Sequence, residues 1–130
     1  MNSSSVTIPE NVSILVVDDE ASIAKMISRS LSQIGFISYS AGNADEALAM
    51  MVEHPFDVVI TDVVMPEMDG RDLSSRLTRL HPALKTLYMS GYTADVIAHH
   101  GVLDEGVQFI QKPFSFRDLA AKVREVVAGE

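Results

Sequence analysis

The sequence has no cysteine among its 130 residues. Disulfides, thiolate metal sites and cysteine nucleophiles are therefore excluded. It also lacks any apolar run long enough to span a membrane, and residues 1–5 lack the charged and apolar regions of a signal peptide. The expectation that follows is a cytoplasmic protein with no membrane association.

Basic residues are scarce: ten Lys and Arg stand against eighteen Asp and Glu, which gives a formal net charge of −8. An acidic domain repels nucleic acid and anionic membranes, so direct binding to either is not expected. The length fits one domain that can bury a core without disulfides or metals. We expect a loose polar tail over residues 1–11 and one folded domain over residues 12–128.

A run of three β-branched residues, Val58–Ile60, lies between Pro55 and Pro66. Such a run predicts a strand that is buried on both faces of a sheet. The run leads into Asp62, and ligands of open parallel sheets bind at the carboxyl edge of the strands. Asp62 is therefore the first candidate for chemistry, although an aspartate at a strand end is also a common turn residue.

Apolar strands and amphipathic helices alternate along the chain. The predicted strands cover residues 12–17, 36–40, 58–62, 87–89 and 107–110. The predicted helices cover residues 23–34, 43–54, 71–81, 93–101 and 115–127. Five strands alternating with five helices indicate a doubly wound α/β fold, in which helices cover both faces of a parallel sheet.

Helical spacing of apolar residues predicts which helix faces turn inward. The residues expected inward are Ile23, Met26, Ile27, Leu31, Ile34, Leu73, Leu77, Leu80, Phe116, Leu119, Val123 and Val127. Asn43 and Glu46 resemble a capping box that opens the second helix, and Gly35 is expected to end the first. The third predicted helix also carries three arginines that lie off its leucine stripe and predict a solvent-exposed face. They are Arg71, Arg76 and Arg79.

Functional groups follow four of the five predicted strands. These groups are Asp18 and Asp19, Asp62, Ser90 and Lys112. Parallel strands end at one edge of the sheet, so these groups are expected to meet despite their separation in sequence. Singly, each has a simpler structural explanation, since Asp-Asp often caps a helix, Ser-Gly forms a turn and Lys-Pro lies in loops. Their joint placement is what favours a site.

Three neighbouring carboxylates repel one another unless protons or a cation compensate them. Mg²⁺ is favoured, because it typically binds one or two carboxylates together with waters and phosphate oxygens. The predicted edge has no His or Cys, which argues against zinc. Asp62 is equipped to act as a nucleophile and form an aspartyl phosphate. Mg²⁺, Lys112 and the Ser90 hydroxyl would then stabilise the phosphoryl oxygens.

Four motifs, in order and at matching spacing, resemble those of the receiver domain of two-component response regulators. They are Val16–Asp19, Thr61–Gly70, Met89–Gly91 and Gln111–Phe114. The resemblance implies a flavodoxin-like five-stranded parallel sheet with strand order 2-1-3-4-5. It also implies that Asp62 accepts a phosphoryl group from a partner, either a histidine kinase or a histidine phosphotransfer protein.

The resemblance also implies how Mg²⁺ would be held. Asp19, Asp62 and the backbone carbonyl of Val64 would bind the ion directly, and Asp18 would help through water. Ser90 and Lys112 would contact the phosphoryl group.

Further expectations from the resemblance concern switching. Phe109 falls at the position of the family's switch aromatic, which moves as Ser90 is drawn toward the phosphate. The Lys112–Pro113 bond is expected to be cis, as it usually is in the family. The implied output surface comprises the fourth helix, the fifth strand and the fifth helix, and a homodimer is compatible with the family.

Five residues are expected to flank the site: Val64, Met65, Gly91, Tyr92 and Pro113. The Val64 side chain cannot hydrogen-bond an attacking water, and Tyr92 is bulky enough to shield an acyl phosphate. We therefore expect slow self-dephosphorylation rather than a turnover enzyme. Residues 90–92 and 102–106 further resemble receivers attached to hybrid sensor kinases.

Three other functions remain open. Aspartyl-phosphate hydrolases of the haloacid-dehalogenase type require a second Asp two residues after the nucleophile, and this chain has Val64 at that position. An interaction module that is never phosphorylated usually loses part of the acid cluster, which is complete here. A flavin-binding protein of similar topology needs a phosphate-cradling Ser/Thr/Gly loop, and no such loop follows the first predicted strand of this chain. The histidines at 54, 81, 99 and 100 are set aside, since two precede prolines and the adjacent pair cannot share a helix face.

Overall fold

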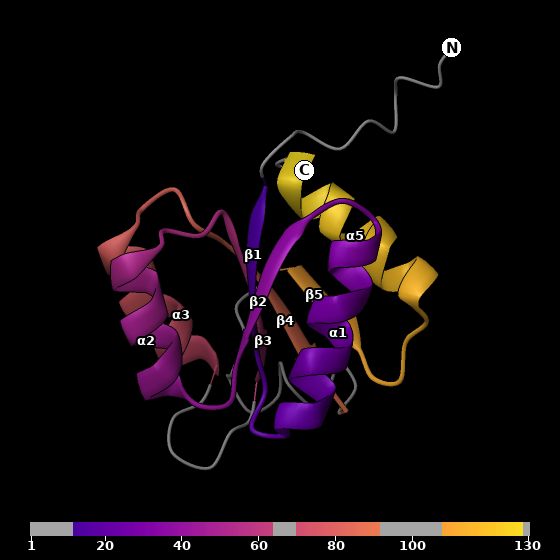
Figure 1. The fold of residues 1–130 in the computed structure, drawn as a ribbon, viewed down its shortest axis with the longest axis horizontal. Coiled ribbons are helices and arrows are strands. Elements are labelled where there is room, and N and C mark those ends of the chain that lie inside the picture. The colour runs from indigo at the N-terminus through magenta and orange to yellow at the C-terminus, as the bar shows by residue number, and fades with distance from the viewer. Residues whose placement is uncertain (1–11, 64–69, 92–107, 129–130) are drawn as a thin grey trace.

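The residues that the structure describes form three layers, with a parallel sheet between two pairs of helices (Figure 1). The computed structural model describes residues 12–63, 70–91 and 108–128. Its strands are β1 (Ser13–Val17), β2 (Ile37–Ala41), β3 (Val58–Asp62), β4 (Lys85–Ser90) and β5 (Gln108–Gln111). Its helices are α1 (Ala21–Gln33), α2 (Ala44–Glu53), α3 (Gly70–Leu80) and α5 (Phe116–Ala128). The predicted tail at residues 1–11 and the predicted helix at 93–101 lie outside the described residues.

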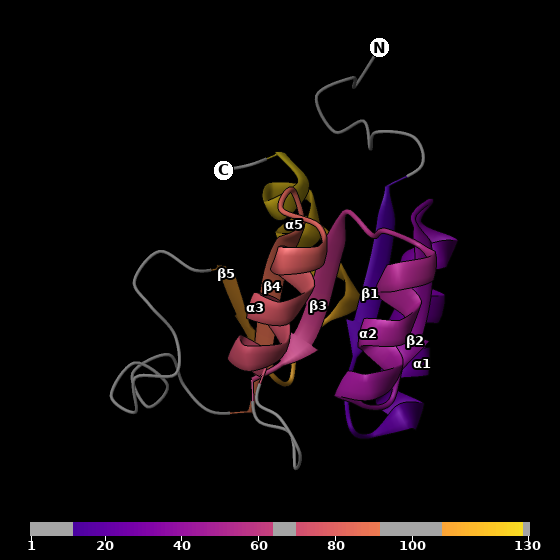
Figure 2. The same ribbon diagram turned by 90° about the vertical axis from the view of Figure 1, so that its left-hand side faces the viewer.

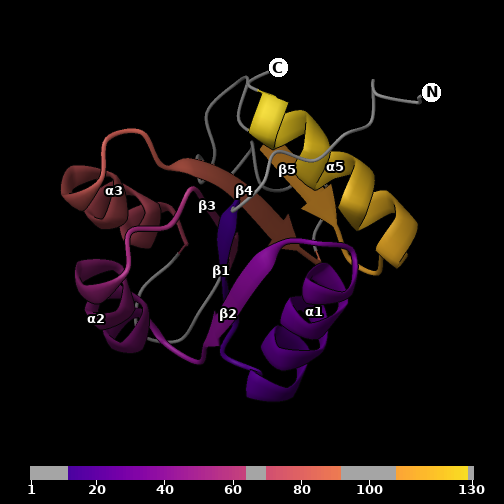
Figure 3. The same cartoon turned by 45° about the horizontal axis from the view of Figure 1, so that its top comes forward.

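The five strands are all parallel and follow the order β2-β1-β3-β4-β5, which confirms the predicted flavodoxin-like sheet. Helices α1 and α5 cover one face, and α2 and α3 cover the other (Figures 2 and 3). Since every strand points the same way, all five carboxyl ends lie at one edge of the sheet. None of the described helices combines the length and the apolar character that a membrane crossing requires.

Alternate residues of the central strands feed two separate cores. Ile14 and Val16 of β1 pack toward α1 and α5, where they join Ile27 of α1. Leu15 and Val17 pack on the opposite face, toward α2 and α3. Successive side chains of a strand point to opposite faces, so a strand that is covered on both sides must be apolar throughout. This explains why β1 and the Val58–Thr61 part of β3 are fully buried.

The predicted helix ends have the expected local hydrogen bonds. The Asn43 side chain accepts from the Glu46 amide at 2.8 Å, and the Glu46 carboxylate accepts in return from the Gly42 amide at 3.0 Å. Gly35 ends α1 with a φ of 109°, a left-handed conformation that favours glycine. The Ser115 hydroxyl accepts from the Asp118 amide at 3.0 Å and opens α5.

The prediction of inward-facing residues was wrong at four positions. The exposed fractions there are 51% for Met26, 39% for Ile34, 52% for Leu80 and 51% for Phe116. In α1 the buried face is instead built partly from Ala24 and Ser28, because small residues allow the helix to lie close to the sheet. Ile34, Leu80 and Phe116 lie at helix ends, beyond the part of each helix that rests on the sheet.

Candidate functional site at the carboxyl edge of the sheet

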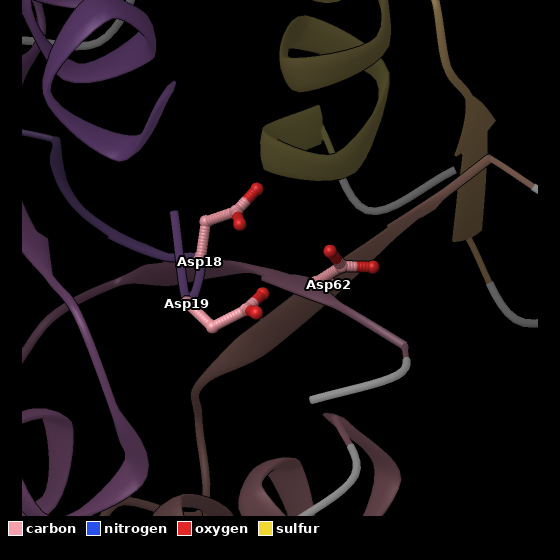
Figure 4. A group of neighbouring side chains, drawn as sticks. All are labelled: Asp18, Asp19 and Asp62. Atoms are coloured by element: carbon pink, nitrogen blue, oxygen red, sulfur yellow. The ribbon is translucent and has the colours of Figure 1, made fainter. Parts of the chain in front are cut away.

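Three aspartates meet at the carboxyl edge of β1 and β3. Asp18 and Asp19 directly follow β1, and Asp62 is the last residue of β3 (Figure 4). One carboxylate oxygen from each lies within 4.8 Å of the others. Asp18 is buried, Asp62 is partly buried and Asp19 is exposed. Like charges at this spacing repel, so the cluster favours a cation that is bound by oxygen ligands.

Asp18 is fixed by the backbone around it. Its Oδ1 accepts from the Glu20 amide at 2.9 Å, at the start of α1. Its own amide donates to the Ala41 carbonyl of β2 at 3.2 Å. The buried carboxylate is therefore held in one orientation by two elements, and its other oxygen is left for Lys112.

Lys112 is the counter-ion inside the cluster. Its Nζ lies 3.0 Å from Asp18 Oδ2 and 3.1 Å from Asp62 Oδ2. Burial of the ammonium lowers the pKa of Lys112, but the hydrogen bonds and negative charges of the two aspartates outweigh burial and raise the pKa above 10.5. The Lys112 amide donates to the Ser90 carbonyl at 2.7 Å, which places the side chain beside the end of β4. As expected, the Lys112–Pro113 bond is cis.

Lys112→Met is expected to lower the free energy of unfolding at pH 8 by about 1–3 kcal/mol, because it leaves a buried carboxylate without its cation. The folded pKa of Lys112 is raised, so its contribution is full below pH 10.5 and is lost as pH rises through the folded pKa. Urea unfolding between pH 8 and pH 12 should therefore show the difference between wild type and variant shrinking at high pH.

Lys122→Met is the matched control for Lys112→Met. Lys122 of α5 lies 3.6 Å from Glu125, whose side chain is 58% exposed, and such surface pairs contribute little. We expect this variant to follow the wild-type pH profile within about 0.5 kcal/mol. An equal loss of stability in both variants would contradict a special role for the Lys112 pairs.

The backbone of Asp62 is held by a close approach from α3. The Val63 amide donates to the Met89 carbonyl at 3.0 Å, and the Gly70 amide donates to the Val63 carbonyl at 2.7 Å. A Cβ atom at Gly70 would lie 2.2 Å from the Asp62 carbonyl oxygen, so only glycine fits there. The sequence predicted Gly70 as the end of the Thr61–Gly70 motif and as the residue before a helix, but not its close approach to Asp62. The sequence did offer a signal: glycine has no side chain that could cap a helix, so a glycine at the start of a helix indicates that another part of the chain approaches closely there.

Ser90 and Phe109 lie on the neighbouring strands. Ser90 is the last residue of β4, is 1% exposed and follows Met89, the strand partner of Asp62. Phe109 of β5 is partly buried and packs against Val63 and Tyr88. The ring therefore belongs to an apolar cluster that includes the residue directly after Asp62.

The remaining predicted flanking residues divide into two groups. Gly91 and Pro113 are exposed beside the ends of β4 and β5. Val64, Met65 and Tyr92 lie outside the described residues. Of the histidines set aside, His54 packs against the Tyr39 and Phe56 rings at the end of α2, away from the acidic cluster.

The sequence of this chain matches the family model of the response regulator receiver domain over residues 14–124. It is 37% identical over 119 residues to the sensor kinase CckA of Brucella abortus, covering 90% of this chain but 13% of that protein. It is 29% identical to the response regulator receiver protein CpdR of the same organism, covering 88% of this chain and 95% of that protein.

Solved structures of similar chains have the same fold. The receiver domain of the hybrid histidine kinase CckA is 28% identical, with a TM-score of 0.74 over 88% of this chain and 98% of that one. The chemotaxis protein CheY4 of Vibrio cholerae is also 28% identical, with a TM-score of 0.79 over 89% of this chain and 98% of that one. The family match spans most of the chain and includes the acidic cluster, so this chain belongs to the response regulator receiver domain family.

Proposed function

We propose that this domain is a phosphoacceptor switch in which Asp62 receives a phosphoryl group from a phosphohistidine of a partner histidine kinase or histidine phosphotransfer protein. The observation that carries the proposal is the position of Lys112 Nζ, 3.1 Å from the Asp62 carboxylate within a cluster of three acids. A nucleophilic carboxylate beside an ammonium group can attack an anionic phosphoryl group, because the cation offsets the repulsion between the two.

The transfer step balances without a further reactant. An Asp62 carboxylate oxygen attacks phosphorus, and an O–P bond forms as the P–N bond of the phosphohistidine breaks. The electron pair of the P–N bond returns to the ring nitrogen, and a phosphohistidine that is protonated on its other ring nitrogen leaves as neutral imidazole. Lys112 and the Ser90 hydroxyl are the groups of this chain that would contact the transferred phosphoryl oxygens.

The acidic cluster fits Mg²⁺ by the chemistry of its donors, since all three side chains offer carboxylate oxygens. Asp19, Asp62 and the Val64 carbonyl would hold the ion, and Asp18 would assist through water. When bound, Mg²⁺ would neutralise charge on the phosphoryl oxygens. Asp18 is suited to the indirect role, because its two oxygens already accept from the Glu20 amide and from Lys112.

Phosphorylation would act by shifting an existing equilibrium between two surface conformations. The surface we assign to output includes β5, α5 and the predicted helix before β5. The apolar cluster of Val63, Tyr88 and Phe109 supports this route, because it extends from the residue after the acceptor to β5. Loss of the phosphoryl group without a partner would be slow, since Val64 cannot orient a water and Tyr92 can shield the acyl phosphate.

Removal of Mg²⁺ tests the proposal. The protein is incubated with an acyl phosphate as donor and weighed intact by mass spectrometry. With Mg²⁺ we expect the mass of one added phosphoryl group per chain, and with excess chelator we expect no added mass, because the phosphoryl charge is then uncompensated. Turnover of many donors per chain would favour the hydrolase, and no gain in mass with Mg²⁺ would favour an interaction module that is never phosphorylated.

A further inference from the structure

Helices α2 and α3 lie side by side on one face of the sheet (Figure 2), and their exposed side chains carry opposite charge. The exposed acids of α2 are Asp45, Glu46 and Glu53, and this helix has no Lys or Arg. The exposed bases of α3 are Arg71, Arg76 and Arg79, against a single acid, Asp72. A domain with net charge −8 thus presents a basic ridge directly beside an acidic one.

Three of these charges, Glu53, Arg76 and Arg79, are not explained by ion pairs among the residues that the structure describes. Asp45 and Glu46 lie in the first turn of α2, where the helix dipole favours acids. Glu53 lies in the last turn, where the dipole disfavours a negative charge, and it has no basic neighbour in that turn.

The same ends of the two helices expose apolar side chains. Val52 of α2 is 71% exposed, and Leu80 of α3 is 52% exposed. Each directly neighbours one of the charged residues above, Glu53 and Arg79 respectively. Both helices run back from the carboxyl edge of the sheet, so these ends lie at the edge opposite Asp62. An apolar pair flanked by unpaired opposite charges is typical of a contact surface.

The charge pattern selects the partner and its orientation. Helix α2 follows β2 and leads into β3, and α3 follows β3 and leads into β4. Because these strands are all parallel, the two helices run in the same direction. If the two-fold axis is parallel to the helices, α2 of each copy lies over α3 of the other copy, so the same contact is made two times. A two-fold axis across the helices instead places α2 on α2, with like charges opposed. Only the first arrangement brings Glu53 to the Arg79 position of a second copy, and Val52 to Leu80.

We propose that the α2–α3 face pairs with the same face of a second copy of this chain, acidic helix against basic helix. Helices of 10 and 11 residues are about 15–16 Å long and pack about 10 Å apart, so the contact is small. An interface of this size belongs to the weak and transient class. The pairing does not depend on phosphorylation of Asp62, because the face is separate from the carboxyl edge.

Sedimentation velocity over a range of protein concentrations tests the pairing. Wild type should dimerise at high concentration and should dissociate as salt is added. Glu53→Arg and Arg79→Glu should each weaken dimerisation at least about tenfold, because each places like charges together twice. An equimolar mixture of the two variants should restore the dimer, since every contact in the mixed pair joins opposite charges again.

Arg124→Glu is the matched control, because Arg124 is an exposed base on α5, on the other side of the sheet. We expect it to dimerise as wild type does, and circular dichroism should show all variants folded. A chain that stays monomeric at every concentration overturns the proposal. So does a dimer that survives both single charge reversals, or a mixture that fails to associate.

Discussion

Asp62→Asn is expected to gain no phosphoryl group under conditions in which wild type gains one. The amide has nearly the shape of the carboxylate but lacks its nucleophilic oxygen, so the acceptor is removed with little change in packing. The variant should remain folded, because removing one of three clustered carboxylates relieves repulsion. Intact mass spectrometry measures the uptake, and thermal unfolding without Mg²⁺ should show no loss of stability.

The control for Asp62→Asn must separate the acceptor from other carboxylates. Asp45→Asn changes an exposed acid in the first turn of α2 that is not part of the acidic cluster, and it should gain one phosphoryl group as wild type does. Within the cluster, Asp18 is buried and already paired with Lys112, while Asp19 is exposed. Uptake by Asp62→Asn at the wild-type level would contradict the assignment and move the acceptor to one of these two residues.

The sheet and its functional edge could be predicted because a buried parallel strand has a recognisable sequence, namely a short run of apolar β-branched residues, and because parallel strands all end at one edge. The β-branched run before Asp62 is buried on both faces, as a central parallel strand must be. Polar groups that follow such strands can be assigned to one edge from strand direction alone. The position of Asp18, Asp62 and Lys112 around one another therefore follows from the alternation of elements rather than from any local spacing.

Helix orientation was less predictable, because counting large apolar residues overlooks small ones. In α1 the buried face runs through Ala24 and Ser28, and Ser28 remains buried because its hydroxyl bonds to Ser38 of β2. Met26 is thereby turned outward. Leu80 belongs to the correct stripe of α3, but it lies at the last residue, where the sheet no longer covers the helix. The spacing of apolar residues predicts which face of a helix is buried, but it does not predict how far along the helix the sheet covers that face.

The distances between atoms of the site could not be predicted from the sequence. That Lys112 bridges Asp18 and Asp62 at nearly equal distances depends on where β5 ends relative to β1 and β3. That Gly70 touches the Asp62 carbonyl depends on how the chain returns into α3. Neither distance leaves a trace in composition or periodicity, although the glycine itself is visible in the sequence.

Gly70→Ala is expected to destabilise the domain and to impair phosphoryl uptake together. The added Cβ would lie 2.2 Å from the Asp62 carbonyl oxygen and 3.1 Å from its carbon, and backbone atoms cannot swing aside as a side chain can. Either α3 or the end of β3 must shift, at a cost of about 1–3 kcal/mol or more. Helix propensity alone predicts the opposite sign, since alanine favours a helix over glycine by about 1 kcal/mol.

The catalytic consequence of Gly70→Ala follows from the same displacement. A shift of about 1 Å in the acceptor can slow a reaction by as much as about a hundredfold, so uptake should fall at least about tenfold. Gly42→Ala is the matched control, because its added Cβ would meet nothing closer than Ala21 at 4.0 Å. Urea unfolding and the rate of mass gain should both separate the two variants. If Gly70→Ala unfolds at the wild-type urea midpoint, α3 does not approach Asp62 this closely, and the acceptor is positioned by β3 and Lys112 alone.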